Sequence, residues 1–231
     1  MDSHVLGAAK AIGWAVIVIG QYDSPFVRRV AVALQHHGMP YEHRPWSVWG
    51  QADQIAELNP LRRVPVVVLD DGEVLIESGA ILDAVDDLAV ARGGDPPPLI
   101  PRAGAARRAV LRGAALSTGL GDKAVSLVYE GHLHAGDHRS AVWTERCTAQ
   151  ICATMDVLER ERAAARGAFW FGSLSHADIA LACALRFVRE AHPDVFDPAR
   201  WPNLAAHADA CEALADFQAV VQPFHVTPPN S

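Results

Sequence analysis

The sequence predicts an α/β domain followed by an all-helical domain, and three features support this fold class. Short β-branched runs alternate with helical periods across residues 14–91, whereas strand patterns largely disappear after residue 103. Between these parts, residues 92–102 contain four prolines and two glycines, which no regular element accepts. We therefore expect an α/β domain at residues 14–91, a linker at residues 92–102 and a helical domain at residues 103–221.

Length and charge limit the classes of partner. The chain has 231 residues, half of them hydrophobic, which is enough for one large or two small cores. Its formal net charge is −7. A chain with this charge is not expected to bind nucleic acid or the surface of an anionic membrane.

The cysteines and the first twenty residues indicate a cytoplasmic protein. All four cysteines fall on helix-patterned segments of the second half, without CxxC or zinc-ligand spacing: Cys147, Cys152, Cys183 and Cys211. The apolar run at residues 11–20 is too short to span a bilayer. Asp2 stands where a signal peptide needs basic residues, and no small-residue cleavage site precedes Gln21. We interpret the run as a buried strand behind a short N-terminal extension.

The first domain is expected to begin with a strand, a helix and a second strand. Residues 14–19 (WAVIVI) have the pattern of a buried strand. Ser24 suits the N-cap of the next helix, Pro25 suits its first position, and Gly38 ends it. Residues 41–58 then predict an edge strand followed by a short helix.

A β-hairpin at residues 64–76 is the centre of the first domain. Two apolar, β-branched runs flank an Asp-Asp-Gly turn at residues 70–72. Pro65 stands at the start of the first run, where a missing N–H is tolerated, and proline is the residue that takes a cis peptide bond most readily. Ser78 suits the N-cap of a helix that continues to about Ala91, and the amides beyond such a cap form an anion site. The alternation of strands and helices implies a parallel crossover pair, and the hairpin adds an antiparallel edge.

The second domain is expected to contain four helices, at residues 103–132, 141–166, 175–191 and 203–220. Gly119 and Gly121 allow a kink in the first of them. Ser175 and Asp178 form a capping box between apolar residues spaced for a hydrophobic staple, which predicts a structural helix start. Residues 222–231 are proline-rich and are expected to fray.

Four matches in this order resemble the cytosolic glutathione transferases over about residues 16–217: Ser24-Pro25-Phe26 after the first strand, Asn59-Pro60 with Val64-Pro65, Glu77-Ser78, and the box at Ser175 and Asp178. Each match alone is weak, but their order and spacing, with an α/β half before an all-α half, are specific to that family. The resemblance implies a thioredoxin-like first domain, a helical second domain, a homodimer and a bacterial, serine-type member.

The resemblance also implies where glutathione binds as co-substrate. Val64 offers its backbone to the cysteinyl part, with Pro65 in the cis form. Glu77 and Ser78 hold the γ-glutamyl end, which agrees with their chemistry, because a carboxylate can meet the α-ammonium while a helix-start amide and hydroxyl meet the α-carboxylate. Phe26 lines the same cleft.

A further contact to glutathione is expected from a basic residue. The family often has a lysine before the Val-Pro pair, and Arg63 stands at that place in this sequence. Arginine keeps the charge for a glycyl carboxylate but changes the geometry. Arg62 and Trp49 are additional candidates for this contact.

Ser24 is the predicted catalytic residue. The thiolate is the reactive form of glutathione, whereas a free thiol of pKa about 8.5 is mostly protonated at neutral pH. A hydroxyl that donates to the sulfur, beside the amides of a helix N-terminus, favours the thiolate. Tyr22 is the rival donor, and a plain N-cap role for Ser24 stays open.

The first domain contains no cysteine, which argues against branches of the family that reduce disulfides. The resemblance therefore implies an enzyme that conjugates glutathione to a small apolar electrophile, as in detoxification. We expect the acceptor pocket between the domains, against residues 116–129 and Trp143. Two alternatives stay open, namely a non-catalytic binding or regulatory protein and a glutathione-dependent isomerase or dehalogenase.

Three histidines between the first two predicted helices of the second domain raise the question of a metal site. His132, His134 and His138 have no acidic or cysteine partner at fixed spacing except Asp137. We therefore predict no metal site and interpret them as solvated loop histidines.

Overall fold

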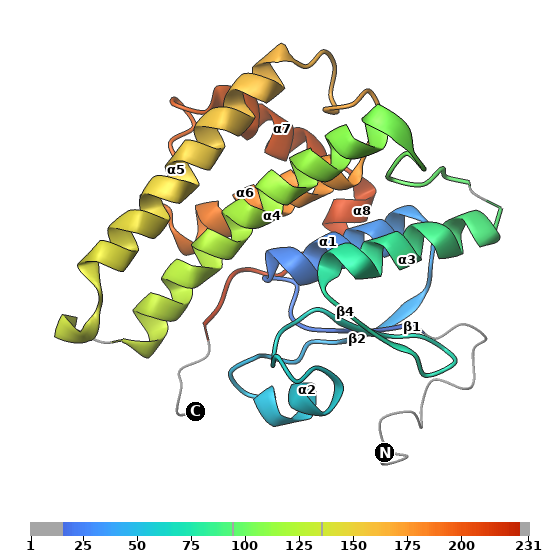
Figure 1. The fold of residues 1–231 in the computed structure, drawn as a ribbon, viewed down its shortest axis with the longest axis horizontal. Helices are drawn as coiled ribbons and strands as arrows, with labels where there is room; N and C mark the ends of the chain where they lie inside the picture. The colour runs from blue at the N-terminus through green and yellow to red at the C-terminus, as the bar shows by residue number, and fades with distance from the viewer. Residues whose placement is uncertain (1–15, 94, 135, 227–231) are drawn as a thin grey trace.

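The computed structural model describes residues 16–93, 95–134 and 136–226, so the N-terminal extension and the start of the strand expected at 14–19 lie outside the described residues. Figure 1 shows the elements in layers. Helix α2 (Ala52–Leu58) covers one face of a small sheet, and α1 (Pro25–His36) and α3 (Ser78–Ala91) cover the other. The long helices of the second half lie beyond α1 and α3.

The sheet contains four strands in the order β2-β1-β3-β4, with bounds β1 Val16–Ile19, β2 Tyr41–Arg44, β3 Val66–Val68 and β4 Val74–Ile76. β1 pairs in parallel with β2, Val16 opposite Tyr41, and β3 pairs antiparallel with β4, Val66 opposite Ile76. Both pairings are as predicted. β3 also lies antiparallel beside β1, and the resulting mixed sheet with helices on both faces confirms the thioredoxin-like fold class.

Apolar side chains on both faces of β1 and β3 explain why helices cover the sheet on both sides. Val18 and Val67 belong to a core with α1 and α3, whereas the neighbouring β1 and β3 residues face α2 and its Ile55. Successive strand residues point to opposite faces, so an uninterrupted run of apolar residues is what a strand covered on both sides requires.

The second half consists of helices α4 (Gly104–Leu133), α5 (Ala141–Ala164), α6 (His176–Ala191), α7 (Pro202–Glu212) and α8 (Ala215–Gln218), with a short 3-10 turn at Gly136–His138. α6 is the central helix, with twelve of its sixteen residues buried. Ile179, Ala182 and Cys183 pack in one core with α1, while Ala180 and Leu181 pack in another with α4 and α5. Both halves of the chain therefore pack against α6.

The predicted capping box at the start of α6 is confirmed, and it is completely buried. The carboxylate of Asp178 accepts from the Ser175 amide at 3.0 Å and from the Ser175 hydroxyl at 2.5 Å. It also accepts from the amide of Trp170 at 2.7 Å, which joins the preceding loop to the helix. Asp178 is 0 % exposed. Without its carboxylate, the amides of Trp170 and Ser175 would lack a hydrogen-bond partner in the core.

A second buried carboxylate connects α3 with both α1 and α6. Asp86 accepts from ring nitrogens of His37 at 3.2 Å and of His176 at 3.0 Å, and from the Leu99 amide at 3.2 Å. Burial alone would raise the pKa of Asp86, but the hydrogen bonds from the two histidines outweigh it and hold the pKa below its ordinary value. Burial lowers the pKa of His176, so its neutral form is favoured.

Three expectations for the second half are corrected. The helix expected at residues 203–220 is divided into α7 and α8 by Leu214, whose extended backbone turns Phe217 and Val220 into the core beside α1. α4 continues as one helix through Gly119 and Gly121. Gly121 faces Pro25 and Phe26, and a Cβ at this position would lie 3.5 and 3.7 Å from them, at ordinary van der Waals distances.

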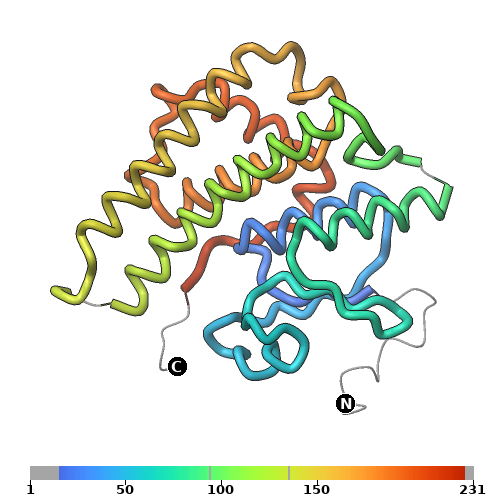
Figure 2. The backbone as a smooth tube through the Cα atoms, in the orientation of Figure 1, coloured from blue at the N-terminus to red at the C-terminus, as the bar shows by residue number. Residues whose placement is uncertain are grey.

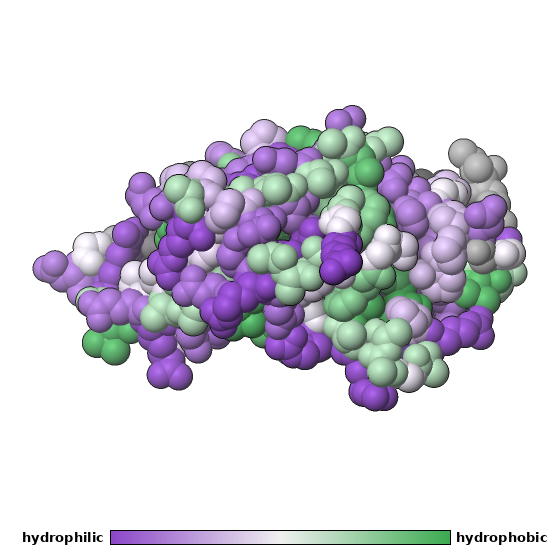
Figure 3. Space-filling model, turned by 90° about the horizontal axis from the view of Figure 1, so that it is seen from above, coloured by the Kyte–Doolittle hydropathy of each residue, from purple (hydrophilic) through white to green (hydrophobic). Residues whose placement is uncertain are grey.

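The tail is the third correction, because residues 222–226 do not fray: they are hydrogen-bonded to the body of the protein. The rest of the predicted tail, residues 227–231, lies outside the described residues. On the face seen in Figure 3, hydrophilic residues predominate, and a hydrophobic strip crosses it to the right of the middle. Within residues 16–93, 95–134 and 136–226, we find no helix that combines the length and hydropathy needed to cross a bilayer.

Candidate functional site

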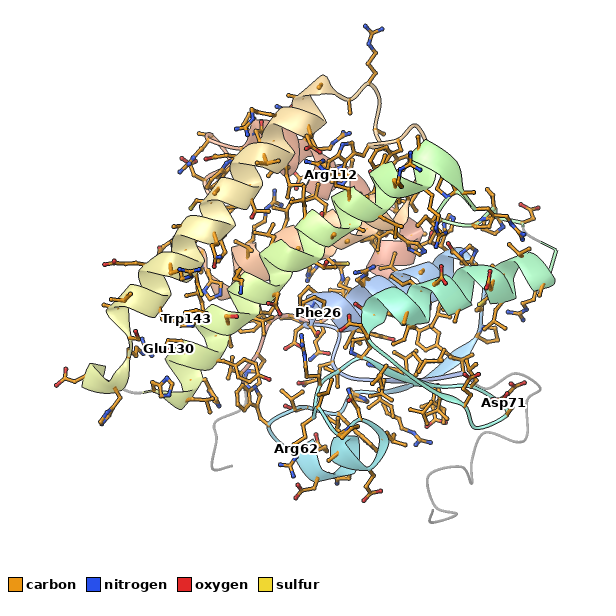
Figure 4. All side chains as sticks on the ribbon, viewed as in Figure 1. Phe26, Arg62, Asp71, Arg112, Glu130 and Trp143 are labelled. Atoms are coloured by element: carbon orange, nitrogen blue, oxygen red, sulfur yellow. The ribbon has the colours of Figure 1, made fainter. Side chains whose placement is uncertain are left out.

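Two adjoining hollows share part of their lining: a wide one between the α/β half and the long helices, and a narrow one within the α/β half. The wide hollow is bounded by the loop before α1, the loop before α2, and α4 and α6; its lining includes Ser24, Trp46, Tyr129 and Phe187. The narrow hollow is bounded by the loop before β3 and the start of α3, including Pro65, Glu77 and Ser78. Phe26, Arg63 and Val64 line both. Figure 4 shows Phe26 at the junction of the two halves. The structure thus brings all seven predicted site residues to one continuous cleft.

The backbone of Val64 is held at the boundary of the hollows. The Val64–Pro65 peptide bond is cis. The side chain of Asn59 donates to the Arg63 carbonyl at 2.8 Å and accepts from the Leu61 amide at 3.1 Å, which holds the loop before β3 in place. Asn59 thus fixes the loop that places Val64 in the lining of both hollows.

Glu77 and Ser78 occupy unusual environments at the start of α3. Ser78 was expected to be the N-cap, but Glu77 takes that position with φ of 68° and Ser78 is the first helical residue. Such a backbone is strained for any residue except glycine, and strain of this kind is concentrated at ligand sites. Ser78 is 1 % exposed, and its Oγ has no hydrogen-bond partner within the described residues. A buried hydroxyl without a partner beside free helix amides is suited to an anionic ligand group.

Ser24 caps α1 and also faces the wide hollow. Its Oγ accepts from the Val27 amide at a long 3.4 Å, and Pro25 is the first helical residue. This cap uses the acceptor capacity of the hydroxyl only, so its proton remains able to reach a sulfur placed in the hollow. The two roles considered for Ser24 are therefore compatible in one geometry.

Tyr22, the rival donor, is directed away from the cleft. Its hydroxyl is 2.8 Å from the Tyr41 hydroxyl, and its ring stacks on His43 with centroids 3.8 Å apart. It lines a separate depression with residues of α1 and β2. Burial and then the Tyr41 hydrogen bond raise the pKa of Tyr22, so it is a poorer donor than an ordinary phenol.

The three residues considered for contact with the glycyl carboxylate, Arg63, Arg62 and Trp49, differ in position. Arg63 lines both hollows and its guanidinium is 3.5 Å from Asp122 on α4. Arg62 is in the lining of neither hollow and pairs with Asp53 at 3.2 Å. Trp49 lines the wide hollow and packs between Tyr129 and His132, with centroid distances of 4.7 and 4.2 Å.

The wide hollow differs in part from the expected acceptor pocket. Val125, Val128 and Tyr129 of α4 line it, as the expected range 116–129 implies. Trp143 lines a further hollow that shares Trp49, Arg63, Val125 and Tyr129 with the wide one, and Lys123 lies over its ring. Figure 4 shows Trp143 on the side of α5 that faces α4. The sequence reasoning missed the aromatic walls from Trp46, Phe187 and Phe224. No local pattern marks them, because they come from three distant segments.

His132 is not a solvated loop histidine as expected, because it belongs to α4 and is half-buried, whereas His134 is exposed after the end of the helix. His132 packs on Trp49, and His134 is 3.1 Å from Glu130. Within the described part of the chain, no three His, Cys, Asp or Glu side chains gather closely enough to hold a metal ion.

Comparison with known proteins decides the family. Residues 18–93 match the model of the glutathione S-transferase N-terminal domain, and residues 141–210 match the model of the C-terminal domain. The chain belongs to the glutathione S-transferase family. The uncharacterized GST-like protein YibF of Escherichia coli (strain K12) is 29 % identical over 171 residues, which are 74 % of this chain and 81 % of YibF.

Solved glutathione transferase structures superpose over nearly the whole chain. The enzyme from Methylobacterium radiotolerans, in complex with glutathione sulfonate, has a TM-score of 0.82 at 28 % identity, covering 92 % of this chain and 97 % of that one. A glutathione transferase family member from Pseudomonas fluorescens Pf-5, with bound glutathione, has a TM-score of 0.79 at 30 % identity, covering 90 % and 100 %. These relatives bind glutathione or its sulfonate.

Proposed function

We propose that this glutathione S-transferase family member is a serine-type enzyme that conjugates glutathione to a small apolar electrophile. The observation that carries the proposal is the buried hydroxyl of Ser78, which has no partner in the described part of the chain and lies beside strained Glu77. It stands at one end of a cleft that contains Ser24 at the other. The γ-glutamyl end occupies the narrow hollow, and Val64 binds the cysteinyl backbone. The sulfur then lies near Ser24, at the entrance to the apolar wide hollow.

Once glutathione is placed in this way, the reaction needs only stabilisation of its thiolate. The hydroxyl of Ser24 donates to the sulfur, and the amides at the start of α1 add partial positive charge, so the thiolate is favoured over the thiol. The sulfur attacks the electrophilic carbon with its lone pair. The thiol proton passes to solvent when the thiolate forms. In a substitution, the bond to the leaving group breaks and the group departs as an anion with the bonding electron pair. In an addition to an activated double bond, the carbanion that forms takes a proton from water.

Ser24→Ala is expected to raise the pKa of bound glutathione towards that of free glutathione and to lower kcat/KM about 10- to 100-fold, since a hydrogen bond to a charged group contributes about 1.5–3 kcal/mol. Ultraviolet absorbance of the thiolate, titrated against pH, measures the pKa directly. Thr154→Ala is the matched control, because the Thr154 hydroxyl donates to the Gln150 carbonyl on α5 and lines neither hollow. If bound glutathione keeps its free pKa in the unmodified protein, the chain is a non-catalytic binder.

Ser78→Ala is expected to separate stability from binding. Because the Ser78 hydroxyl has no protein partner among the described residues, its removal should leave the free energy of unfolding unchanged or raise it by about 1 kcal/mol. Glutathione affinity should fall about tenfold, measured by isothermal titration calorimetry. A loss of stability with unchanged affinity would contradict the assignment of Ser78 to the γ-glutamyl site.

We further infer a homodimer that acts in the cytoplasm. All four cysteines are free, which fits a reducing compartment. Analytical ultracentrifugation over a range of concentrations tests the dimer, and a monomer throughout would contradict it. A screen of isomerase and dehalogenase substrates distinguishes those reactions, which use the same glutathione site, from conjugation.

A further inference from the structure

A third hollow, the one that Trp143 lines, lies between the ends of the two long helices and the segment around α2. Figure 2 shows the end of α4 and the start of α5, in yellow-green and yellow, on the same side of the molecule as this segment, in cyan. Leu133 and Trp143 form one wall, Leu61 belongs to the other, and Arg63 lines all three hollows. The volume of the third hollow, about 610 Å³, lies in the range of roughly 300–1,000 Å³ that small-molecule sites occupy.

Large apolar side chains are exposed around the third hollow. Leu61 is 66 % exposed, Leu133 55 % and Trp143 37 %, and they come from the loop before β3, the end of α4 and the start of α5. Single exposed apolar residues are ordinary, but three of them in one lining, beside the rings of Trp49 and Tyr129, form an apolar patch of the kind that marks a binding site. The third hollow is therefore suited to an apolar, aromatic group.

The charged side chains of this lining are already paired within the protein. The pairs, with their nitrogen–oxygen distances, are Arg62 with Asp53 at 3.2 Å, Arg63 with Asp122 at 3.5 Å, and Glu130 with His134 at 3.1 Å. A charged ligand group would have to break one of these pairs to gain a partner, and a charge removed from water without a partner is costly. The third hollow therefore favours a group without charge.

Arg63 connects this hollow with the glycyl end of glutathione. In the placement proposed above, the γ-glutamyl end occupies the narrow hollow and the sulfur lies at the wide one, so the glycyl end at Arg63 is the part that faces the third. The carboxylate of Asp122 competes with a free glycyl carboxylate for the Arg63 guanidinium. An amide on the glycine carries no negative charge and leaves the pair of Arg63 and Asp122 intact.

We propose that the third hollow binds a neutral aromatic group joined by an amide to the glycyl end of glutathione, so that thiols extended at the glycine are co-substrates of this protein. The proposal rests on the proposed function, because it uses the placement of glutathione given there. The rings of Trp49, Tyr129 and Trp143 would hold the aromatic group by offset or edge-to-face contacts. Reaction at the sulfur is unaltered, since the extension is attached at the other end of the cysteinyl-glycine unit.

Isothermal titration calorimetry with two amides of glutathione tests the site. The glycyl N-methylamide and N-benzylamide are neutral at the same position and differ only in the ring, so the ratio of their affinities reports the third hollow. We expect the benzylamide to bind about tenfold more tightly than the methylamide, and Trp143→Ala to lower this ratio about fivefold. Val142→Ala is the matched control, because Val142 is the neighbouring residue, is 77 % exposed and is not in the lining; it should change the ratio less than about twofold.

Leu133→Ala tests the same wall from α4 if Trp143→Ala does not fold, and it should lower the ratio of the amide affinities about threefold. S-benzylglutathione separates the third hollow from the wide one, because it carries its ring on the sulfur. Trp143→Ala should therefore change the ratio of its affinity to that of glutathione less than about twofold.

Three outcomes overturn the third-hollow site while the proposed function stands. These are equal affinities of the two amides in the unmodified protein, a loss with Val142→Ala as large as that with Trp143→Ala, and an equal loss with Trp143→Ala for the ring on the sulfur. A protein that binds neither glutathione nor the amides overturns the proposed function and this site with it. If glutathione binds but keeps its free thiol pKa, catalysis alone is overturned, and the ratio of the two amides still decides the site.

Discussion

Asp178→Ala is expected to lower the free energy of unfolding by about 3–5 kcal/mol, the largest effect that we predict for a single substitution. The carboxylate is 0 % exposed and accepts from the Trp170 amide, the Ser175 amide and the Ser175 hydroxyl. Alanine leaves all three donors in the core without a partner and without access to water. α6 depends on this cap, and both halves of the molecule pack on α6.

Urea unfolding followed by circular dichroism measures this change. Asp197→Ala is the matched control, because the Asp197 carboxylate accepts from one backbone amide, that of Ala199 at 2.8 Å, and is exposed. We expect the control to lose less than about 1 kcal/mol. A similarly small loss for Asp178→Ala would show that water or a shifted backbone replaces the carboxylate.

Asp86→Asn is expected to lower the free energy of unfolding by about 2–3 kcal/mol at neutral pH. Asp86 serves three donors, from His37, His176 and Leu99, with two carboxylate oxygens. Asparagine has one carbonyl oxygen, and its amide nitrogen would face a ring N–H. Since these donors come from α1, α6 and the linker, the loss should weaken the junction of the two halves.

The same substitution is expected to change how stability depends on pH. The pKa of Asp86 is lowered by folding, so its contribution is present above the unfolded pKa of about 3.9 and is lost as pH falls through the folded value. The pKa of His176 is also lowered, so protonation of the unfolded chain reduces stability below about pH 6.5. The unmodified protein should therefore lose stability from about pH 6.5 downward, and its advantage over Asp86→Asn should shrink below about pH 4.

Urea unfolding between neutral pH and about pH 3 tests this dependence. Asp83→Asn is the matched control on the same helix, because Asp83 pairs with Arg107 at 2.8 Å with its side chain 60 % exposed. The control should follow the unmodified protein to within about 0.5 kcal/mol at each pH. A constant difference between Asp86→Asn and the unmodified protein down to the lowest pH would contradict a carboxylate role for Asp86.

Several features of this protein are determined locally and could therefore be predicted from the sequence. The box at Ser175 and Asp178, the cap at Ser24 and the hairpin before Glu77 depend on neighbours within a few residues, so the order of residue types is enough to predict them. The family resemblance adds the site residues, because their spacing along the chain is specific even where each motif is weak.

Other features depend on contacts between distant segments, which no local pattern records. β3 lies between β1 and β4, Tyr22 turns to Tyr41 and away from the cleft, and residues 224–226 line the wide hollow. Each of these features depends on burial and hydrogen bonding between residues that are far apart in the sequence. The sequence by itself therefore determined the fold class and predicted residues that line the narrow hollow. Only the tertiary structure decided the walls of the wide hollow, because they come from the loop before α2, α4, α6 and the tail, which meet only in the folded chain.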